Sequence, residues 1–225
     1  MSENNPIIRA ENITKIYKLG EIKVEALKGV SLLVEKGDFL IITGRNGSGK
    51  STLMRQLALV DRPNSGEIYL NGQPVTKISS QERRKLRLTK LGYIFQEYAL
   101  IAELSALENV MIPAMMLKSA RECREPAANL LKKVGLGDKL DNLPSQLSGG
   151  EQQKVAIARA LINDPEVIFA DEPTANLDTY AAKDVLNIFQ HLNQHDRHTI
   201  VMITHEPEEE KYANKIIRLS DGRII

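Results

Sequence analysis

The sequence predicts an α/β fold in which one parallel sheet is covered by helices on both faces. Short apolar strands alternate with helices at both ends of the chain, a pattern typical of such sheets. A long helical stretch interrupts this alternation at about 97–160, which indicates an inserted subdomain. The length of 225 residues and the 42% hydrophobic content suit one domain with an insertion.

The expected elements follow from apolar periodicity and from turn residues. Before the insertion we expect strands at 7–13, 24–34 (a strand pair or one bulged strand), 39–43, 66–70 and 91–95, and helices at 50–60 and 79–89. Inside it we expect helices at 105–116, 121–134 and 151–162. After it come strands at 167–170, 199–203 and 215–219, with a helix at 179–194. We interpret 1–225 as a single domain, with a core of 1–96 and 161–225 and a helical subdomain at 97–160.

Composition limits the classes of partner. The formal net charge is +1, so no overall basic field indicates a nucleic-acid partner, and we expect none. We expect the basic run at 83–87 to be a solvated helix face, with a lipid-headgroup role left open. Cys123 is the single cysteine, which excludes a disulfide within the chain and indicates a reducing compartment. The sequence has no run of ~20 apolar residues, so a membrane role requires a partner.

A glycine-rich loop follows the expected strand at 39–43. It reads GRNGSGKST and leads into a helix, which matches G-x-x-x-x-G-K-[ST] in its proper context and disfavours a chance glycine turn. Such a loop directs backbone N–H groups at phosphate oxygens, and the helix adds its positive end. We expect Lys50 to meet the β- and γ-phosphates and Ser51 to meet Mg²⁺. The expected nucleotide-binding residues of the loop are Gly44, Asn46, Gly47, Ser48, Gly49, Lys50, Ser51 and Thr52.

Two carboxylates end the expected strand at 167–170. Asp171 can hold Mg²⁺, and Glu172 can orient and polarise an attacking water. Two solvated carboxylates at a strand end are the alternative interpretation. The preceding phosphate loop and the α/β pattern favour the catalytic one.

A second glycine-containing helix start reads LSGGEQQ at 147–153. Ser148 and Glu151 have the spacing of a capping box, so a well-capped helix is one interpretation. The glycines also leave N–H groups that can meet an anion. Because the chain already has a phosphate loop, this second anion-binding end suggests that another copy of the chain covers the nucleotide.

In these segments the sequence resembles the ABC ATPases over nearly its whole length. GRNGSGKST resembles their Walker A motif, LSGGE their signature motif, and IFADE their Walker B motif with its catalytic glutamate. The resemblance implies a P-loop NTPase (RecA-like) core with an antiparallel β subdomain and an inserted α-helical subdomain. It also implies ATP and Mg²⁺ as cofactors and ATP hydrolysis as the activity.

Four single residues also fit the family and keep its order. Gln96 fits the Q-loop glutamine, Asp178 ends a D-loop-like NLD, and His205 fits the switch histidine. Tyr17 fits the aromatic residue that stacks on adenine. Alone, each has an ordinary explanation, such as a helix N-cap for Asp178 or core packing for Tyr17. Their common order favours the functional interpretation.

The resemblance implies a site shared by two chains that dimerise on ATP. Catalysis would use Glu172, His205 and Gln96, and Mg²⁺ would be held by Ser51, Gln96 and Asp171. The second chain would bring its signature helix to the γ-phosphate, and Asp178 would communicate across the interface. The signature residues expected at the nucleotide are Ser148, Gly149, Gly150 and Glu151.

The resemblance further implies an integral-membrane permease as partner, gripped by a groove between the helical block and the segment 96–104. The chain would then be cytoplasmic, on the inner face of the cell membrane, and would contact the membrane only through that partner. ALENVMIPAMM and DEPTANLD are most like the lipoprotein-release and macrolide-export group (LolD/MacB-like). Export or extraction of lipoprotein, peptide or other hydrophobic cargo is the function this implies. Arg45-Asn46, Lys154 and Ala175 depart from that group's usual residues.

Two other functions are weighed against transport. A division-type ABC ATPase would signal through a membrane partner without moving cargo, and the sequence leaves this alternative open. A soluble ABC-type ATPase acting on DNA or ribosomes would carry coiled-coil inserts or a second nucleotide domain. The sequence has neither long heptads nor an internal repeat.

Overall fold

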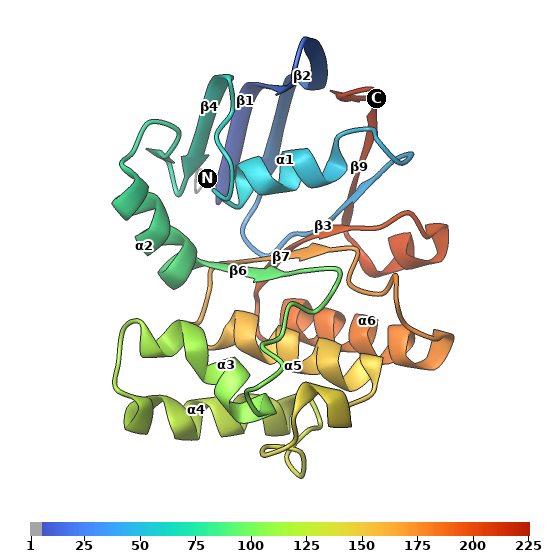
Figure 1. Cartoon of the computed structure of the whole chain (residues 1–225). Helices are drawn as coiled ribbons and strands as arrows, with labels where there is room; N and C mark the ends of the chain where they lie inside the picture. Colours follow the sequence, from blue (N-terminus) through green and yellow to red (C-terminus); the bar gives the residue numbers. More distant parts are fainter. Residues whose placement is uncertain (1–5) are drawn as a thin grey trace, which may run out of the picture.

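The computed structural model describes residues 6–225, which form two sheets and a set of helices around them (Figure 1). The strands are β1 (Ile8–Leu19), β2 (Ile22–Val34), β3 (Phe39–Thr43), β4 (Ser65–Leu70), β5 (Gln73–Pro74), β6 (Leu91–Ile94), β7 (Val167–Asp171), β8 (Thr199–Ile203), β9 (Lys215–Ser220) and β10 (Arg223–Ile224). The helices are α1 (Lys50–Leu57), α2 (Ser80–Lys90), α3 (Ala106–Met115), α4 (Ala120–Lys133), α5 (Gly149–Leu161) and α6 (Thr179–Gln194). Two 3₁₀ turns, η1 (Pro144–Gln146) and η2 (Pro207–Tyr212), complete the described elements.

The central sheet has the order β10-β9-β3-β8-β7-β6, and its inner strands pair in parallel. Parallel strands covered on both faces are apolar throughout rather than alternating. The sequences FLIIT, VIFAD and TIVMI meet this condition, and nearly all their residues are buried. The α/β class expected from the sequence is confirmed.

A smaller antiparallel sheet has the order β2-β1-β4-β5. The strand expected at 7–13 continues as β1 to Leu19, pairing with β2 through three register shifts, so the expected end at 13 is wrong. The segment 24–34, left open as a pair or one bulged strand, is the single bulged strand β2. The turn at Asn71-Gly72 joins β4 to β5, and both residues have positive φ as such turns require.

Two cores cover the two faces of the central sheet. In one, α1 lies between the central sheet and the antiparallel sheet, and Leu53, Met54 and Leu57 are buried there (Figure 1). In the other, α5 and α6 pack against the opposite face, and α3 and α4 pack on α5. Because α5 and α6 lie directly under the strands, the helical block is fixed to the sheet that carries the site.

The helices α3, α4 and α5 form in the stretch expected to be helical, although α5 begins two residues earlier than expected. Ser105 and Ser148 start α3 and α5 with full capping boxes that use Glu108 and Glu151. Within residues 6–225, no helix is both long enough and apolar enough to cross a membrane.

One surface expectation is wrong. The basic run at 83–87 is not simply a solvated face, because Arg83 is buried and Arg87 is half-buried. The guanidinium of Arg83 donates to the carbonyls of Leu59 and Asp61, and that of Arg87 also donates to Leu59. These arginines therefore hydrogen-bond carbonyl groups that lie just beyond the C-terminal end of α1.

Candidate nucleotide-binding site

Four neighbouring strands of the central sheet end at the same edge, and each is followed by an expected site residue. The phosphate loop follows β3, Gln96 follows β6, Glu172 follows β7, and His205 follows β8. Open α/β sheets bind ligands at this carboxyl edge. A groove of ≈ 590 Å³ lies there, lined among others by Tyr17, Asn46, Gly47, Gly49, Lys50, Ser51, Thr52, Gln96 and Glu172.

Close backbone contacts fix the phosphate loop. A Cβ on Gly44 would lie 2.2 Å from the carbonyl oxygen of Leu219, and one on Gly49 would lie 2.5 Å from that of Ala26. Both glycines have positive φ, at 147° and 104°. The loop therefore needs glycine at these positions for space as well as for conformation.

Buried polar atoms inside the loop fit a phosphate. Lys50 is 5% exposed, and its Nζ donates to the carbonyls of Gly44 and Arg45 at 2.9 and 3.3 Å. The buried Oγ of Ser48 has no hydrogen-bond partner among the described residues. A buried hydroxyl without a partner costs free energy, and a phosphate oxygen would supply the partner. The loop also precedes the N-terminus of α1, whose dipole favours an anion.

Ser51 and Asp171 meet where the loop approaches the end of β7. The Ser51 hydroxyl lies 3.1 Å from Oδ1 of Asp171, and the Tyr93 hydroxyl donates to Oδ2 at 3.3 Å. Burial raises the pKa of Asp171, although the hydrogen bonds from Ser51 and Tyr93 oppose that shift. Burial and the nearby Asp171 carboxylate raise the pKa of Tyr93 far above its usual value, so Tyr93 remains a donor. A hydroxyl beside a carboxylate is the oxygen set that suits Mg²⁺.

Glu172 and His205 lie side by side at the ends of β7 and β8. Nδ1 of His205 is 3.6 Å from Oε2 of Glu172, and Nε2 is 3.1 Å from Oε1 of Glu206. Glu172 has φ of 46°, the left-handed region that non-glycine residues seldom adopt. Strain of this kind persists where the surroundings impose it and is concentrated at functional sites. Glu172 is also one of the residues that line the groove.

The segment after Gln96 connects three parts of the site. Tyr98 and Ala99 both have positive φ, and the Arg159 guanidinium donates to their two carbonyls. The Tyr98 hydroxyl donates to the carbonyl of Asn176, whose own amide donates to the carbonyl of Gln96. The strand end, α5 and the NLD segment are therefore held together by hydrogen bonds.

The signature residues do not line the groove. Ser148 is exposed and caps α5: its hydroxyl accepts from the N–H of Glu151, and the Glu151 carboxylate accepts from the N–H of Ser148. Asp178 caps α6, accepting from the N–H groups of Tyr180 and Ala181 at 2.9 Å. The ordinary interpretations of these residues are therefore true within one chain, and their roles toward a nucleotide stay predictions.

Tyr17 also lines the groove. Its hydroxyl donates to Asp61 at 3.2 Å, and the Nζ of Lys15 lies 5.1 Å from its ring centroid. Burial raises the pKa of Asp61, but hydrogen bonds from Lys15, Arg62 and Tyr17 outweigh it and lower the pKa overall. The structure thus places Tyr17 in the wall of the groove, with its hydroxyl held by the hydrogen bond to Asp61.

The sequence did not predict some of the residues that line the groove. The wall also includes Val24, Glu25, Ala26, Lys28, Asp221 and Gly222. The N–H of Gly222 donates to the carbonyl of Ser48 at 3.0 Å, and its carbonyl accepts from the N–H of Lys28 at 2.9 Å. The Asp-Gly pair at 221–222 signals a turn, but nothing local shows that the turn supports a loop far away in sequence.

Comparisons with known proteins agree with this geometry. The family described as ABC transporter matches residues 27–175. The chain is 47% identical to the lipoprotein-releasing system ATP-binding protein LolD of Aquifex aeolicus, over 97% of this chain and 96% of that one. It is 48% identical to the macrolide export ATP-binding/permease protein MacB of Syntrophobacter fumaroxidans, of which it spans 31% while 97% of this chain is covered.

A solved structure of the ATP-binding cassette MJ0796, dimeric and in a post-hydrolysis state with ADP and Pi, is 39% identical with a TM-score of 0.89. That alignment covers 96% of each chain. The sequence motifs, the sheet that positions them and these likenesses agree. The chain belongs to the ABC transporter family, and its fold is that of the family's ATP-binding, ATP-hydrolysing cassette.

Proposed function

We propose that this chain binds ATP with Mg²⁺ in the groove, hydrolyses it as a dimer, and drives a separate membrane permease. The observation that carries the proposal is the meeting of the phosphate loop, Asp171, Glu172, Gln96 and His205 at one sheet edge. The chain belongs to a family of ATPases, which supports the hydrolytic reaction.

Different groove residues would contact different parts of the nucleotide. The loop N–H groups, Lys50 and the Ser48 hydroxyl would hold phosphate oxygens, and Tyr17 would stack on the base. Ser51, Asp171 and Gln96 would hold Mg²⁺, which when bound neutralises charge on the phosphates. The hydroxyl–carboxylate pair of Ser51 and Asp171, 3.1 Å apart, is the part of this set that the fold already brings together.

Glu172 is the proposed general base for the attacking water. Its carboxylate enters the groove from a strained backbone position, and it would accept the proton that the water loses as it attacks the γ-phosphorus. His205, at 3.6 Å, would orient Glu172 and stabilise charge on the transferred phosphoryl group. Catalysis would then depend mainly on positioning and electrostatics.

A second chain would complete the site. The exposed Ser148 caps the N-terminal end of α5 and is followed by the half-buried Gly149 and Gly150, and these residues do not line this chain's own groove. A dimer that places this end over the partner's nucleotide would satisfy its N–H groups with phosphate. The dimeric state of MJ0796, bound to ADP and Pi, supports this arrangement.

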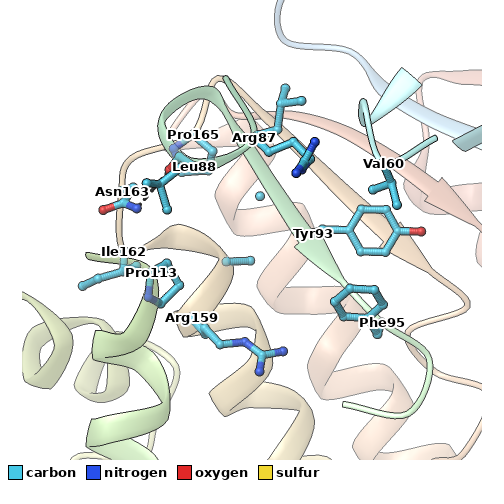
Figure 2. Close-up of a pocket in the computed structure, with 13 residues that line it drawn as sticks. Val60, Arg87, Leu88, Tyr93, Phe95, Pro113, Arg159, Ile162, Asn163 and Pro165 are labelled. Carbon is cyan, nitrogen blue, oxygen red and sulfur yellow. Dashed lines mark hydrogen bonds between the residues drawn. The ribbon is translucent and has the colours of Figure 1, made fainter. Parts of the chain in front are cut away.

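The membrane partner would dock at a second groove, of ≈ 380 Å³, between the sheet and the helical block. Figure 2 shows its walls, which include Val60 after α1, Phe95 after β6, Pro113 in α3 and Arg159 in α5. Met115, Met116 and Leu117, at the nearby end of α3, are each about half or more exposed. Apolar side chains around a groove at this boundary suit a helix of the permease. The similarity of this chain to LolD and MacB favours lipoprotein or another hydrophobic molecule as the cargo.

The test is the substitution Glu172→Gln, which keeps the side-chain shape and removes the base. We expect turnover to fall by at least about a hundredfold. ATP binding should survive, so that ATP shifts the variant from monomer to dimer in size-exclusion chromatography.

Glu208→Gln is the matched control, because Glu208 is an exposed carboxylate after β8 that does not line the nucleotide groove. It should hydrolyse ATP like the parent and form no ATP-trapped dimer. A Glu172→Gln protein that still turns over normally, or that binds ATP and remains monomeric, would contradict the proposed site.

A further inference from the structure

Tyr93 is a polar residue near the Mg²⁺ ligands that the proposed mechanism does not use. It lies on β6, and its ring lines the groove assigned to the permease, beside Phe95 (Figure 2). Its hydroxyl points away from that groove to Oδ2 of Asp171, at 3.3 Å. One side chain therefore reaches from the partner groove to the nucleotide site.

The strand register fixes this approach. In the parallel pair of β6 and β7, Tyr93 lies opposite Phe169 and Ile94 opposite Ala170. Because side chains alternate along a strand, Phe169 and Asp171 face the same side as Tyr93. The Tyr93 hydroxyl thus meets the residue two positions beyond its direct partner, a diagonal separation that a long side chain can span.

Packing also limits the motion of the ring. The Tyr93 ring centroid lies 4.6 Å from that of Phe95 and 6.4 Å from that of Phe169. Aromatic neighbours at these distances hold the ring plane, and the hydroxyl is held with it. The donor to Asp171 is therefore a rigid one.

The two oxygens of Asp171 have different partners. Ser51 lies at Oδ1 and Tyr93 at Oδ2, so the carboxylate is fixed at both ends. A serine hydroxyl has lone pairs left for a cation while its proton is donated. The Tyr93 hydroxyl faces the other oxygen, Oδ2, and so does not compete with the ion for Oδ1. Its hydrogen bond sets the rotation of the carboxylate.

We propose that Tyr93 is a positioning residue that orients Asp171 for Mg²⁺ through its hydroxyl. This inference rests on the proposed function, because it assumes that Asp171 holds the ion. A tyrosine that merely satisfies its buried hydroxyl would make no difference to ion binding, and this distinguishes the two roles.

The experiment compares Tyr93→Phe with the parent, because this change removes one oxygen and keeps the ring. Binding of a fluorescent N-methylanthraniloyl ATP is titrated with excess Mg²⁺ and again with EDTA. We expect the variant's affinity to weaken roughly three- to tenfold in Mg²⁺ and to stay unchanged in EDTA. The Mg²⁺ concentration for half-maximal binding should rise by a similar factor.

Tyr69→Phe is the matched control, since Tyr69 lies on β4 outside the groove and should change neither titration. Asp171→Asn provides a second test. With Asn at 171, adding Tyr93→Phe should change the Mg²⁺ titration no further, because the carboxylate that Tyr93 orients is gone.

Equal Mg²⁺ titrations for Tyr93→Phe and the parent would overturn the inference, and so would tighter binding in Mg²⁺. An equal loss in Mg²⁺ and in EDTA would also overturn it, because that result describes general damage to the site. A parent that binds no nucleotide would overturn the proposed function itself, which separates the two failures.

Discussion

The phosphate loop and the start of α5 are both glycine-containing helix beginnings, but the chain surrounds them differently. Around the loop, Lys50 is 5% exposed and Ser48 is buried, and β2 and the β9–β10 turn close over the backbone. At α5, Ser148 is exposed and caps the helix through reciprocal hydrogen bonds with Glu151. Both motifs can be recognised in the sequence, but a single chain surrounds only the phosphate loop with the groups that a nucleotide would contact.

The difference lies in the range of the supporting contacts. The loop conformation depends on backbone groups of Ala26, Leu219 and Gly222, all distant in sequence. The hydrogen bonds that cap the α5 start come from within four residues, between Ser148 and Glu151, although its glycines also lie close to Tyr98 and Ala181. A site held by long-range contacts can be ready in the free chain, whereas a locally capped helix end gains a ligand only when another surface approaches it. The phosphate loop and the α5 start are the two halves of the proposed shared site, and substitutions in them should therefore impair different steps.

The largest effect on nucleotide binding should come from Lys50→Met, which alters the phosphate-loop half of the site. Losing a buried charge that can bond phosphate should weaken nucleotide binding to the monomer by roughly tenfold to a hundredfold, and turnover should fall with it. Fluorescent ATP titration at protein concentrations below dimerisation measures this. Lys77→Met, at an exposed lysine, is the control. Unchanged binding to the Lys50 variant would remove the distinction between the halves.

A different failure is expected for Ser148→Asp. Aspartate also caps helices, so α5 should keep its start, while the added negative charge would repel the partner's γ-phosphate. Monomer affinity for ATP should be unchanged, and turnover should fall by about tenfold or more. Ser105→Asp makes the same change in the equivalent box of α3 and should leave turnover intact. Weakened binding to the monomeric Ser148 variant would show that α5 acts within its own chain.

The sequence predicted best the elements whose signals are local. The buried strands at 39–43 and 199–203 have their predicted bounds because apolar runs are bounded by polar residues. The helix at 179–194 also matches, since Asp178 caps it. Lys50 and Glu172 were predicted from their own motifs and Gln96 from the family resemblance, and all three line the groove at the carboxyl edge of the central sheet.

Features that depend on distant partners were not predicted. The second half of β1 contains polar residues that hide the strand pattern in the sequence. It forms a strand because it pairs with β2, with β-bulges in the register. The charge of Arg83 indicated solvent, but it bonds carbonyls beyond α1 that only the fold brings near. The same reason hides Gly222, whose turn supports the phosphate loop from the end of the central sheet.

The smallest expected effect concerns the outer wall of the loop half, where Asp61 holds Tyr17 and Lys15. The pKa of Asp61 is lowered in the folded chain, so its ionised form stabilises the fold above its usual pKa of 3.8 and ceases to as pH falls through the lowered value. Asp61→Asn should lower the free energy of unfolding at pH 7 by less than about 1 kcal/mol, because the group is partly exposed.

In urea unfolding without nucleotide, the difference in unfolding free energy between parent and variant should be unchanged between pH 7 and pH 5.5 and should shrink as pH falls below 3.8. Asp141→Asn, at an exposed turn, should show no gap at any pH. A gap that widens in acid would mean that the carboxylate is disfavoured in the folded chain. The wall around Tyr17 would then form only when the nucleotide arrives, and the loop half would resemble the α5 half in waiting for its ligand.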